Sequence, residues 1–394
     1  MGSRHKKRKL KKIPKILFLS FLIVTILSVT LIYLNDKGIL KKEVVNVQEI
    51  QKKKKKESKD YEAKIFMVGD ALIHWGVYND AKQSDGSYNF KPQLEYIKPI
   101  SSKYDLAYYN QETILGGAAL GYSSYPRFNS PQEVGDAFID AGFNMVSLAT
   151  NHTMDKGEAG VLNSVEYWKN HPEVAASGQW ASDAERSEGV SKIYEKNNIK
   201  YAFISYTIWT NGLETPTGKE YLNNVYSPEK AKSDIELVRD KVDFVIVAMH
   251  WGTEYSMEVN STQSSLAQRL ADAGADVIIG NHVHVIEPFE WIGDSVCFYA
   301  MGNLLSSQID VENRIGMMAG LDLVKTDDGV KIENLRADLH YTYLEGEYPD
   351  LRTNIQVYPF SQLNDSILPD HERIYAEFQR VMTSLDNNIQ IGGV

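Results

Sequence analysis

The feature that most constrains the fold is a regular alternation of short apolar runs with amphipathic stretches from Tyr61 onward. Several apolar runs are nearly continuous, as in strands that are buried on both faces of a sheet. The strand candidates are residues 63–70, 104–112, 144–151, 200–207, 242–250, 276–282, 295–303 and 316–324. The helix candidates between them are residues 130–142, 160–170, 227–242 and 264–275. This alternation predicts an α/β fold.

The N-terminal region contains a candidate membrane anchor. Residues 16–34 are 19 residues without a charge, close to the length that crosses a bilayer, and eight Lys and Arg precede them. The positive-inside rule then predicts a cytoplasmic basic segment at 1–15, a single-pass anchor in the cell membrane at 16–34, and an extracellular main domain after a basic stalk at 35–60. A cleaved signal peptide is the alternative. The length of the run and the lack of a small-x-small cleavage site favour an anchor.

The charge is divided unevenly along the chain. Residues 1–57 hold 16 Lys and Arg against 4 Asp and Glu, a net charge of +12; the whole chain carries −10, which leaves −22 for residues 58–394. The strong negative charge of residues 58–394 argues against nucleic acid as a partner. The lysine run at 52–56 is typical of a solvated stalk, with contact to an anionic surface polymer as the alternative. The single cysteine, Cys297, excludes a Cys-rich zinc site.

Polar residues follow the apolar runs where strands are expected to end. They are Asp70 and His74, Asn110 and Glu112, Asn151 and His152, His250 and Glu254, and His282 and His284. Singly, each could be a turn residue, a helix cap or a core histidine. Together they favour a two-metal site, because these side chains bind Mn, Fe or Zn and open α/β sheets bind ligands at strand ends. The two-residue spacing of His282 and His284 would place both imidazoles on one side of an extended strand.

These motifs, taken in order, resemble the CapA family of poly-γ-glutamate capsule synthesis proteins, a branch of the calcineurin-like metallophosphoesterase superfamily. The resemblance is carried by Asp70 with His74, and by residues 110–112 (NQE), 149–157 (ATNHTMDKG), 250–255 (HWGTEY), 280–285 (GNHVHV) and 290–303. It implies a four-layer α/β/β/α metallophosphatase-like sandwich over residues 61–330. Residues 331–394 would form a C-terminal extension.

The resemblance also implies roles for individual residues. Asp70 and His284 would bind one divalent transition metal ion (Mn, Fe or Zn), Asn151, His250 and His282 would bind a second, and Glu112 would bridge them. His152 would be catalytic and face the substrate phosphate. No further cofactor is expected. Residues expected in the surrounding pocket are His74, Asn110, Asp155, Glu254 and Asn303.

Two functions of different classes fit this sequence. The first is a membrane-anchored, extracytoplasmic phosphoesterase-like hydrolase in capsule (poly-γ-glutamate) biosynthesis. The second is a non-catalytic assembly or export factor of a surface-polymer synthase complex. The partners expected are the membrane, an anionic surface polymer or its phosphorylated precursor, and membrane synthase subunits.

We expect a fragment that begins at Ser58 to fold without residues 1–57, because the net charge changes from +12 to −22 across this point. Its thermal unfolding should be cooperative, and its midpoint should match that of the full-length chain. A fragment that aggregates or melts without a cooperative transition would show that the N-terminal residues take part in folding.

Overall fold

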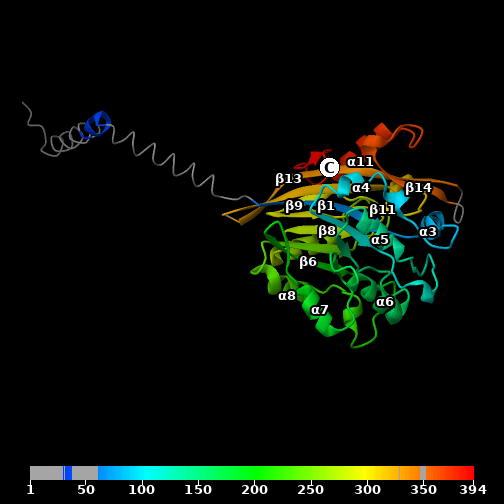
Figure 1. The fold of residues 1–394 in the computed structure, drawn as a ribbon. Helices are drawn as coiled ribbons and strands as arrows, with labels where there is room; N and C mark the ends of the chain where they lie inside the picture. The colour runs from blue at the N-terminus through cyan, green and yellow to red at the C-terminus, as the bar shows by residue number, and fades with distance from the viewer. Residues whose placement is uncertain (1–29, 31, 38–60, 328, 347–351) are drawn as a thin grey trace, which may run out of the picture. The chain divides into compact units, whose positions relative to one another are not determined.

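A computed structural model of the chain describes residues 30, 32–37, 61–327, 329–346 and 352–394 (Figure 1). Asp60–Val394 form one compact unit. Within the described residues, no helix is both long enough and apolar enough to cross a membrane. Of the predicted anchor at 16–34, only residues 30 and 32–34 are described; the basic segment at 1–15 and most of the stalk at 35–60 lie outside the described residues.

The larger sheet contains nine strands within the described part of the chain. Its order is β14-β13-β12-β1-β2-β3-β4, with β11 beside β1 and β15 beside β13. The strands are β1 (Tyr61–Ala71), β2 (Leu106–Gln111), β3 (Met145–Ser147), β4 (Ala175–Ser177), β11 (Asn303–Leu305), β12 (Ile315–Thr326), β13 (Gly329–Glu345), β14 (Thr353–Pro359) and β15 (Gln390–Ile391). Strands β1 to β4 run parallel, so their carboxyl ends lie at one edge.

The smaller sheet contains six strands of the described residues in the order β5-β6-β7-β8-β10-β9. They are β5 (Tyr194–Lys196), β6 (Ile199–Thr207), β7 (Phe244–His250), β8 (Val277–Asn281), β9 (Phe289–Ile292) and β10 (Ser295–Phe298). Strands β6, β7, β8 and β10 are parallel, which again gathers their carboxyl ends at one edge. Both sheets can therefore deliver side chains to a common site.

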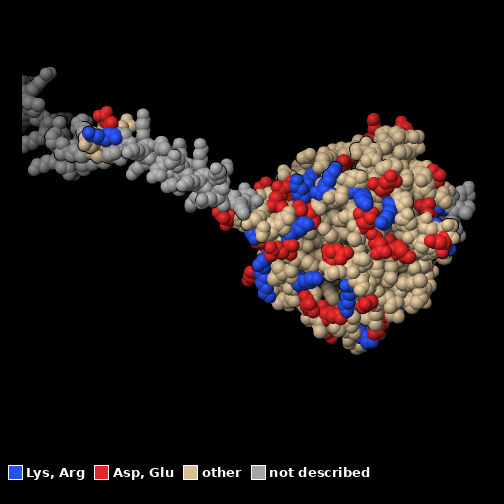
Figure 2. Space-filling view, viewed as in Figure 1, with Lys and Arg blue, Asp and Glu red and all other residues tan. Residues whose placement is uncertain are grey.

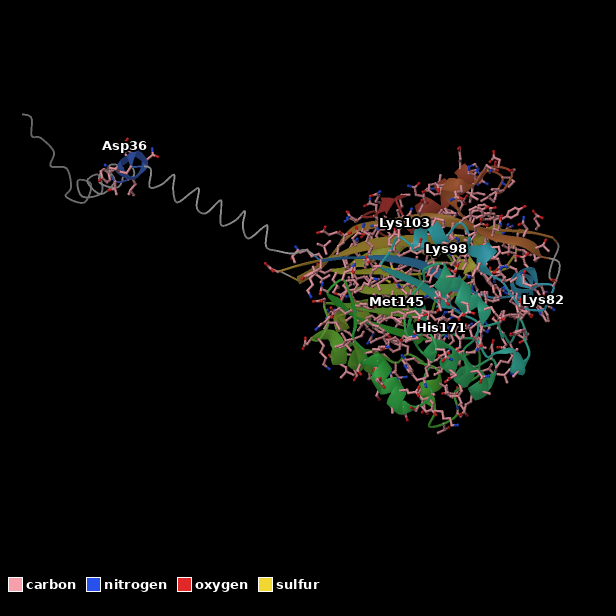
Figure 3. The ribbon with its side chains drawn as sticks, viewed as in Figure 1. Asp36, Lys82, Lys98, Lys103, Met145 and His171 are labelled. Carbon is pink, nitrogen blue, oxygen red and sulfur yellow. The ribbon has the colours of Figure 1, made fainter. Side chains whose placement is uncertain are left out.

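The two sheets share a buried core that includes Met67 and Tyr108 from one sheet and Phe203, Ile246 and Ile279 from the other. Met145, labelled in Figure 3, belongs to this core. The outer face of each sheet has a separate core with helices, α3, α5 and α6 on the larger sheet and α7, α8 and α9 on the smaller one. The prediction of a mixed α/β fold is confirmed.

The helices described within residues 61–394 are short. They are α3 (Trp75–Ala81), α4 (Lys98–Ser101), α5 (Glu133–Asp140), α6 (Gly157–Lys169), α7 (Asp183–Val190), α8 (Pro228–Arg239), α9 (Ser261–Ala273), α10 (Val311–Arg314) and α11 (His371–Met382). The 3₁₀ turns are η1 (Lys91–Leu94), η2 (Ala118–Leu120), η3 (Glu220–Leu222) and η4 (Phe360–Gln362). Helix α11 places Ile374, Phe378 and Met382 in the core that the sheets share, so residues 331–394 pack with the rest of the unit.

Each predicted strand region contains a strand, but residues 295–303 form two strands, β10 and β11, which lie in different sheets. The chain crosses from one sheet to the other between them. Two glycines make room for the crossing: a Cβ on Gly69 would lie 1.8 Å from the carbonyl oxygen of Gly302, and one on Gly280 would lie 1.8 Å from that of Tyr299. The crossing segment thus ties the end of β1 to the end of β8, beside Asp70.

A buried carboxyl group fixes the chain after β8. Glu287 is fully buried and accepts a hydrogen bond from Gln263 Nε2. Gln263 also completes a capping box with Asn260 at the start of α9. Burial, opposed by the Gln263 hydrogen bond, raises the pKa of Glu287 to about 8. The folded protein therefore favours the protonated form of this side chain at neutral pH.

We expect the Glu287→Gln variant to gain stability relative to the wild type as the pH rises from about 4.5 to about 8. In this window the unfolded wild-type chain has lost the proton of Glu287 while the folded chain keeps it, so wild-type stability falls with pH. The neutral amide has no such dependence, and the relative gain should reach about 4 kcal/mol at pH 8.

Urea unfolding at several pH values measures this difference. Glu290→Gln, which removes a half-buried carboxylate bonded to the Tyr299 hydroxyl, controls for the loss of a charge nearby. A difference between Glu287→Gln and wild type that stays constant across the window would mean that Glu287 is ionised in the folded protein.

Candidate metal centre

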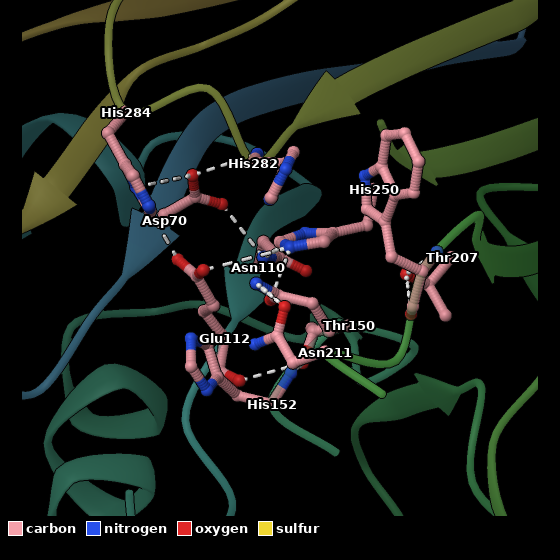
Figure 4. A network of polar contacts seen from close by, with 12 residues as sticks. Asp70, Asn110, Glu112, Thr150, His152, Thr207, Asn211, His250, His282 and His284 are labelled. Carbon is pink, nitrogen blue, oxygen red and sulfur yellow. Dashed lines mark hydrogen bonds and ion pairs between the residues drawn. The ribbon is translucent and has the colours of Figure 1, made fainter. Parts of the chain in front are cut away.

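Polar side chains from both sheets meet at the carboxyl ends of the parallel strands (Figure 4). Asp70 lies near the end of β1, Glu112 directly after β2, and His250 at the end of β7. His282 and His284 follow β8, and Asn151 lies in the turn after β3. All six are buried, at 5% exposure or less. The structure thus brings together the complete set of ligands expected from the sequence.

Two overlapping groups of side chains have metal-binding geometry. Asp70, Glu112 and His284 form one, and Glu112, His250 and His282 form the other; within each group, one ligand atom per residue lies within 4.8 Å of the others. Glu112 belongs to both. Its Oε1 is 3.7 Å from His250 Nε2, and its Oε2 is 3.7 Å from His284 Nδ1. These separations are too long for hydrogen bonds and leave space between the donor atoms.

The chemistry of these residues fits two divalent ions. Both carboxylate oxygens of Glu112 and the Nδ1 of His282 are buried without a hydrogen-bond partner among the described residues. Within the same residues, no Lys or Arg forms an ion pair with Asp70 or Glu112. Buried carboxylates without a cation are costly, and bound dications would offset that cost. The donor set of carboxylate, imidazole and amide suits Mn, Fe or Zn.

The pKa values of the carboxyl groups and imidazoles in this site also fit the binding of cations. Burial raises the pKa of Asp70 to about 7, and burial together with the charge of Asp70 raises the pKa of Glu112 well above its usual value. Burial lowers the pKa of His282 to about 4 and holds those of His250 and His284 well below the usual range. The histidines are therefore neutral, as metal ligands must be.

Neighbouring amides orient these side chains. Asn110 donates Nδ2 to Asp70 Oδ1 at 2.8 Å, and Asn303 Oδ1 lies 3.0 Å from His284 Nδ1. Asn151 Oδ1 lies 2.9 Å from His250 Nε2. These contacts hold the rotamers of Asp70, His250 and His284.

The turn after β8 corrects one expectation from the sequence. His282 and His284 do not continue an extended strand, because β8 ends at Asn281 and both histidines have positive φ, 103° and 63°. The main-chain N–H of His282 donates to Asp70 Oδ2 at 3.1 Å, which helps to hold the turn. Left-handed backbone is unfavourable for histidine, and such strain is typical of functional sites.

His152 is held beside Glu112 by its own set of contacts. Its Nδ1 lies 2.7 Å from Asp155 Oδ2, an oxygen that also accepts the main-chain N–H of Phe128. The imidazole packs edge-on against the Phe128 ring at 4.6 Å. Thr150 Oγ1 accepts the N–H of His152 and donates to the carbonyl oxygen of Glu112. With Nδ1 engaged, Nε2 is the nitrogen that can serve a substrate.

The remaining pocket candidates differ in position. His74 is half-buried and packs against Phe128, at the wall of a separate cavity. Glu254 is exposed and belongs to neither metal-binding group. Sequence reasoning missed two residues: Thr150, which lies inside the ATNH motif, and Asn211, whose Oδ1 accepts a hydrogen bond from Asn151 at 3.4 Å. Asn211 lies in a loop without a recognisable pattern.

We expect Glu112→Gln to lower the metal content of the full-length chain from two ions to one or none, because the shared ligand loses its charge. Elemental analysis after loading with Mn²⁺ and desalting measures this. Glu254→Gln removes a nearby exposed carboxylate and should keep both ions. Unchanged stoichiometry in Glu112→Gln, with an unchanged circular dichroism spectrum, would exclude Glu112 as a shared ligand.

Comparison with known proteins places the chain in a family. Residues 64–308 match the family described as "Bacterial capsule synthesis protein PGA_cap". The "PGA biosynthesis protein CapA" of Bacillus subtilis (strain 168) is 31% identical over 209 residues, which cover 51% of this chain and 52% of that protein. The "Capsule biosynthesis protein CapA" of Bacillus anthracis is 26% identical over 251 residues, with coverages of 61% and 59%.

The alignments thus span between about half and three fifths of each curated relative. A solved structure, TT1561 of Thermus thermophilus, is 10% identical and covers 65% of this chain and 93% of its own. The TM-score of the two structures is 0.37. The family match covers more than half of the residues and includes every candidate metal ligand. The chain therefore belongs to the CapA (PGA_cap) family of bacterial capsule synthesis proteins.

Proposed function

We propose that this chain is a membrane-anchored, extracytoplasmic phosphoesterase that depends on two divalent metal ions and acts in poly-γ-glutamate capsule biosynthesis. The observation that supports it most is the pair of buried ligand groups that share Glu112, with the His152–Asp155 pair beside them. Two sheets with helices on both outer faces are also what a four-layer metallophosphatase-like sandwich requires. The curated relatives are named for biosynthesis of PGA or of a capsule.

In this proposal Asp70 and His284 would hold one ion, Asn151, His250 and His282 would hold the other, and Glu112 would be a ligand of both. Ions bound there would supply Lewis-acid polarisation of the phosphoryl oxygens and a nucleophile activated near neutral pH. Asn110 and Asn303 keep Asp70 and His284 in their binding orientations. Burial of all these side chains excludes bulk water and strengthens each electrostatic contact.

His152 is the residue proposed to handle the proton. Its Nε2 donates a proton to the oxygen that leaves the phosphorus atom. Asp155, in contact with Nδ1, keeps the imidazole in the required tautomer. The edge-on contact with the Phe128 ring limits rotation of the imidazole.

Surface charge limits how an anionic polymer can approach. Residues 58–394 carry a net charge of −22, and Lys and Arg are interspersed with Asp and Glu on the face in Figure 2. We therefore propose that an anionic polymer, or its phosphorylated precursor, makes contact through bound metal ions or through the lysines at 52–56, which lie outside the described residues.

The second candidate function is a non-catalytic factor for assembly or export of the polymer, in contact with membrane synthase subunits. It is favoured by the names of the relatives, which state a role in biosynthesis and no hydrolytic reaction. In that case the metal ions would bind the polymer without turnover.

We expect His152→Ala to lower kcat for diphenyl phosphate, whose phenol leaving group is a weak acid that needs a proton, by about 10²-fold or more, with normal metal content and melting temperature, because the leaving oxygen loses its acid. Asp155→Asn should give a smaller loss and a shifted pH profile, since it disturbs His152 indirectly. His171→Ala removes a histidine that contacts Asp136 and Glu173, outside the metal centre, and should keep full activity. If the metal-loaded wild type hydrolyses neither a phosphoester nor a bond of the polymer, the phosphoesterase proposal is wrong and the assembly function is favoured.

A further inference from the structure

A cavity of about 550 Å³ adjoins the metal centre on the side of His284. The Tyr255 ring in its wall lies 5.8 Å from the His284 ring. A second wall residue, Gln308, donates Nε2 to the Tyr255 hydroxyl and accepts Nδ2 of Asn303, the residue that contacts His284. Tyr255 and Gln308 thus form a wall that the cavity shares with the surroundings of His284.

The cavity has an unusual number of exposed aromatic and aliphatic side chains. Trp75, Tyr125 and Tyr255 are 45%, 77% and 57% exposed, and Ile309 is 52% exposed. These four are among eleven large hydrophobic side chains that are exposed in the described residues. They come from distant segments of the chain. Exposed apolar groups gathered around one cavity indicate a binding surface for a ligand with apolar faces.

The polar part of the lining is almost free of charge. Ser124, Ser307, Gln308 and Asn313 offer neutral donors and acceptors, and Asp310 adds a carboxylate. Within the described residues, no Lys or Arg lines the cavity. Neutral hydrogen-bonding groups and one carboxylate suit hydroxyl groups, whereas a ligand rich in carboxylates would find no cation.

We propose that this cavity binds an uncharged, polyhydroxylated glycosyl group joined to the phosphate that the metal centre holds. A sugar ring offers C–H faces to Trp75 and Tyr125 and hydroxyls to the neutral polar side chains and Asp310. A γ-glutamyl segment has a carboxylate on every residue and fits this lining poorly. A volume of about 550 Å³ is also far larger than a single ammonium group needs, which argues against an aromatic cage for a cation. The inference rests on the proposed function in one respect, which is the binding of the phosphate group at the metal centre.

The test compares glucose 1-phosphate with methyl phosphate, which has the same charged group without the sugar. Both are titrated calorimetrically into the full-length chain loaded with Mn²⁺. The wild type should bind glucose 1-phosphate at least about tenfold more tightly, a difference of about 1.4 kcal/mol. Trp75→Ala and Tyr125→Ala should lose most of this preference and keep their affinity for methyl phosphate.

Trp209→Ala is the matched control, because Trp209 is 47% exposed and its ring lies 6.3 Å from His282, yet it does not line the cavity. This variant should keep the wild-type ratio of the two affinities. Equal binding of both phosphates by the wild type would overturn the proposal. The proposal would also be overturned if a γ-glutamyl oligomer displaced glucose 1-phosphate from the wild type but not from Trp75→Ala. In that case the cavity would hold the polymer.

Hydrolysis of bis(p-nitrophenyl) phosphate by the same preparation separates this inference from the proposed function. A preference for the sugar phosphate without hydrolysis would support the glycosyl site and contradict the phosphoesterase. Hydrolysis without a preference for the sugar phosphate would support the phosphoesterase and contradict the glycosyl site. If neither phosphate binds to the metal-loaded chain, both proposals are wrong.

Discussion

The burial of Asp70 and Glu112 in the same space, without a Lys or Arg beside them in the described residues, is the constraint on which the rest of the structure depends. Burial raises the pKa of both carboxyl groups, the charge of Asp70 raises that of Glu112 further, and the pair destabilises a fold that has no cation to offset it. The imidazoles and amides that surround them are neutral donors of the kind that metal ions accept. The site is arranged for dications.

The architecture brings these groups together through the ends of parallel strands. The larger sheet supplies Asp70 and Glu112, and the smaller sheet supplies His250 and the turn with His282 and His284. Close approach of the two sheets depends on the segment that crosses between β10 and β11, and hence on the missing side chains of Gly69 and Gly280. A side chain at either glycine would push the crossing segment away and separate the two halves of the site.

Much of this could be predicted from the sequence, because buried parallel strands are apolar runs and their ends carry conspicuous polar residues. The residues expected as ligands converge for that reason. The division of residues 295–303 between two sheets was not predictable, since it depends on Cβ clearances between segments far apart in sequence. The contact of Asp155 with His152 requires the turn between them, and the role of Asn211 comes only from its position in three dimensions. Strand β13 begins at Gly329, next to the boundary expected at 330, and pairs with β12 before it and β14 after it.

The most direct measurement is anomalous X-ray diffraction from crystals of the full-length chain soaked with Mn²⁺. Two anomalous peaks are expected, one between Asp70 and His284 and the other between His250 and His282, with Glu112 in contact with both. A single peak, two peaks of which neither touches Glu112, or metal bound only at surface carboxylates would contradict a shared two-metal centre.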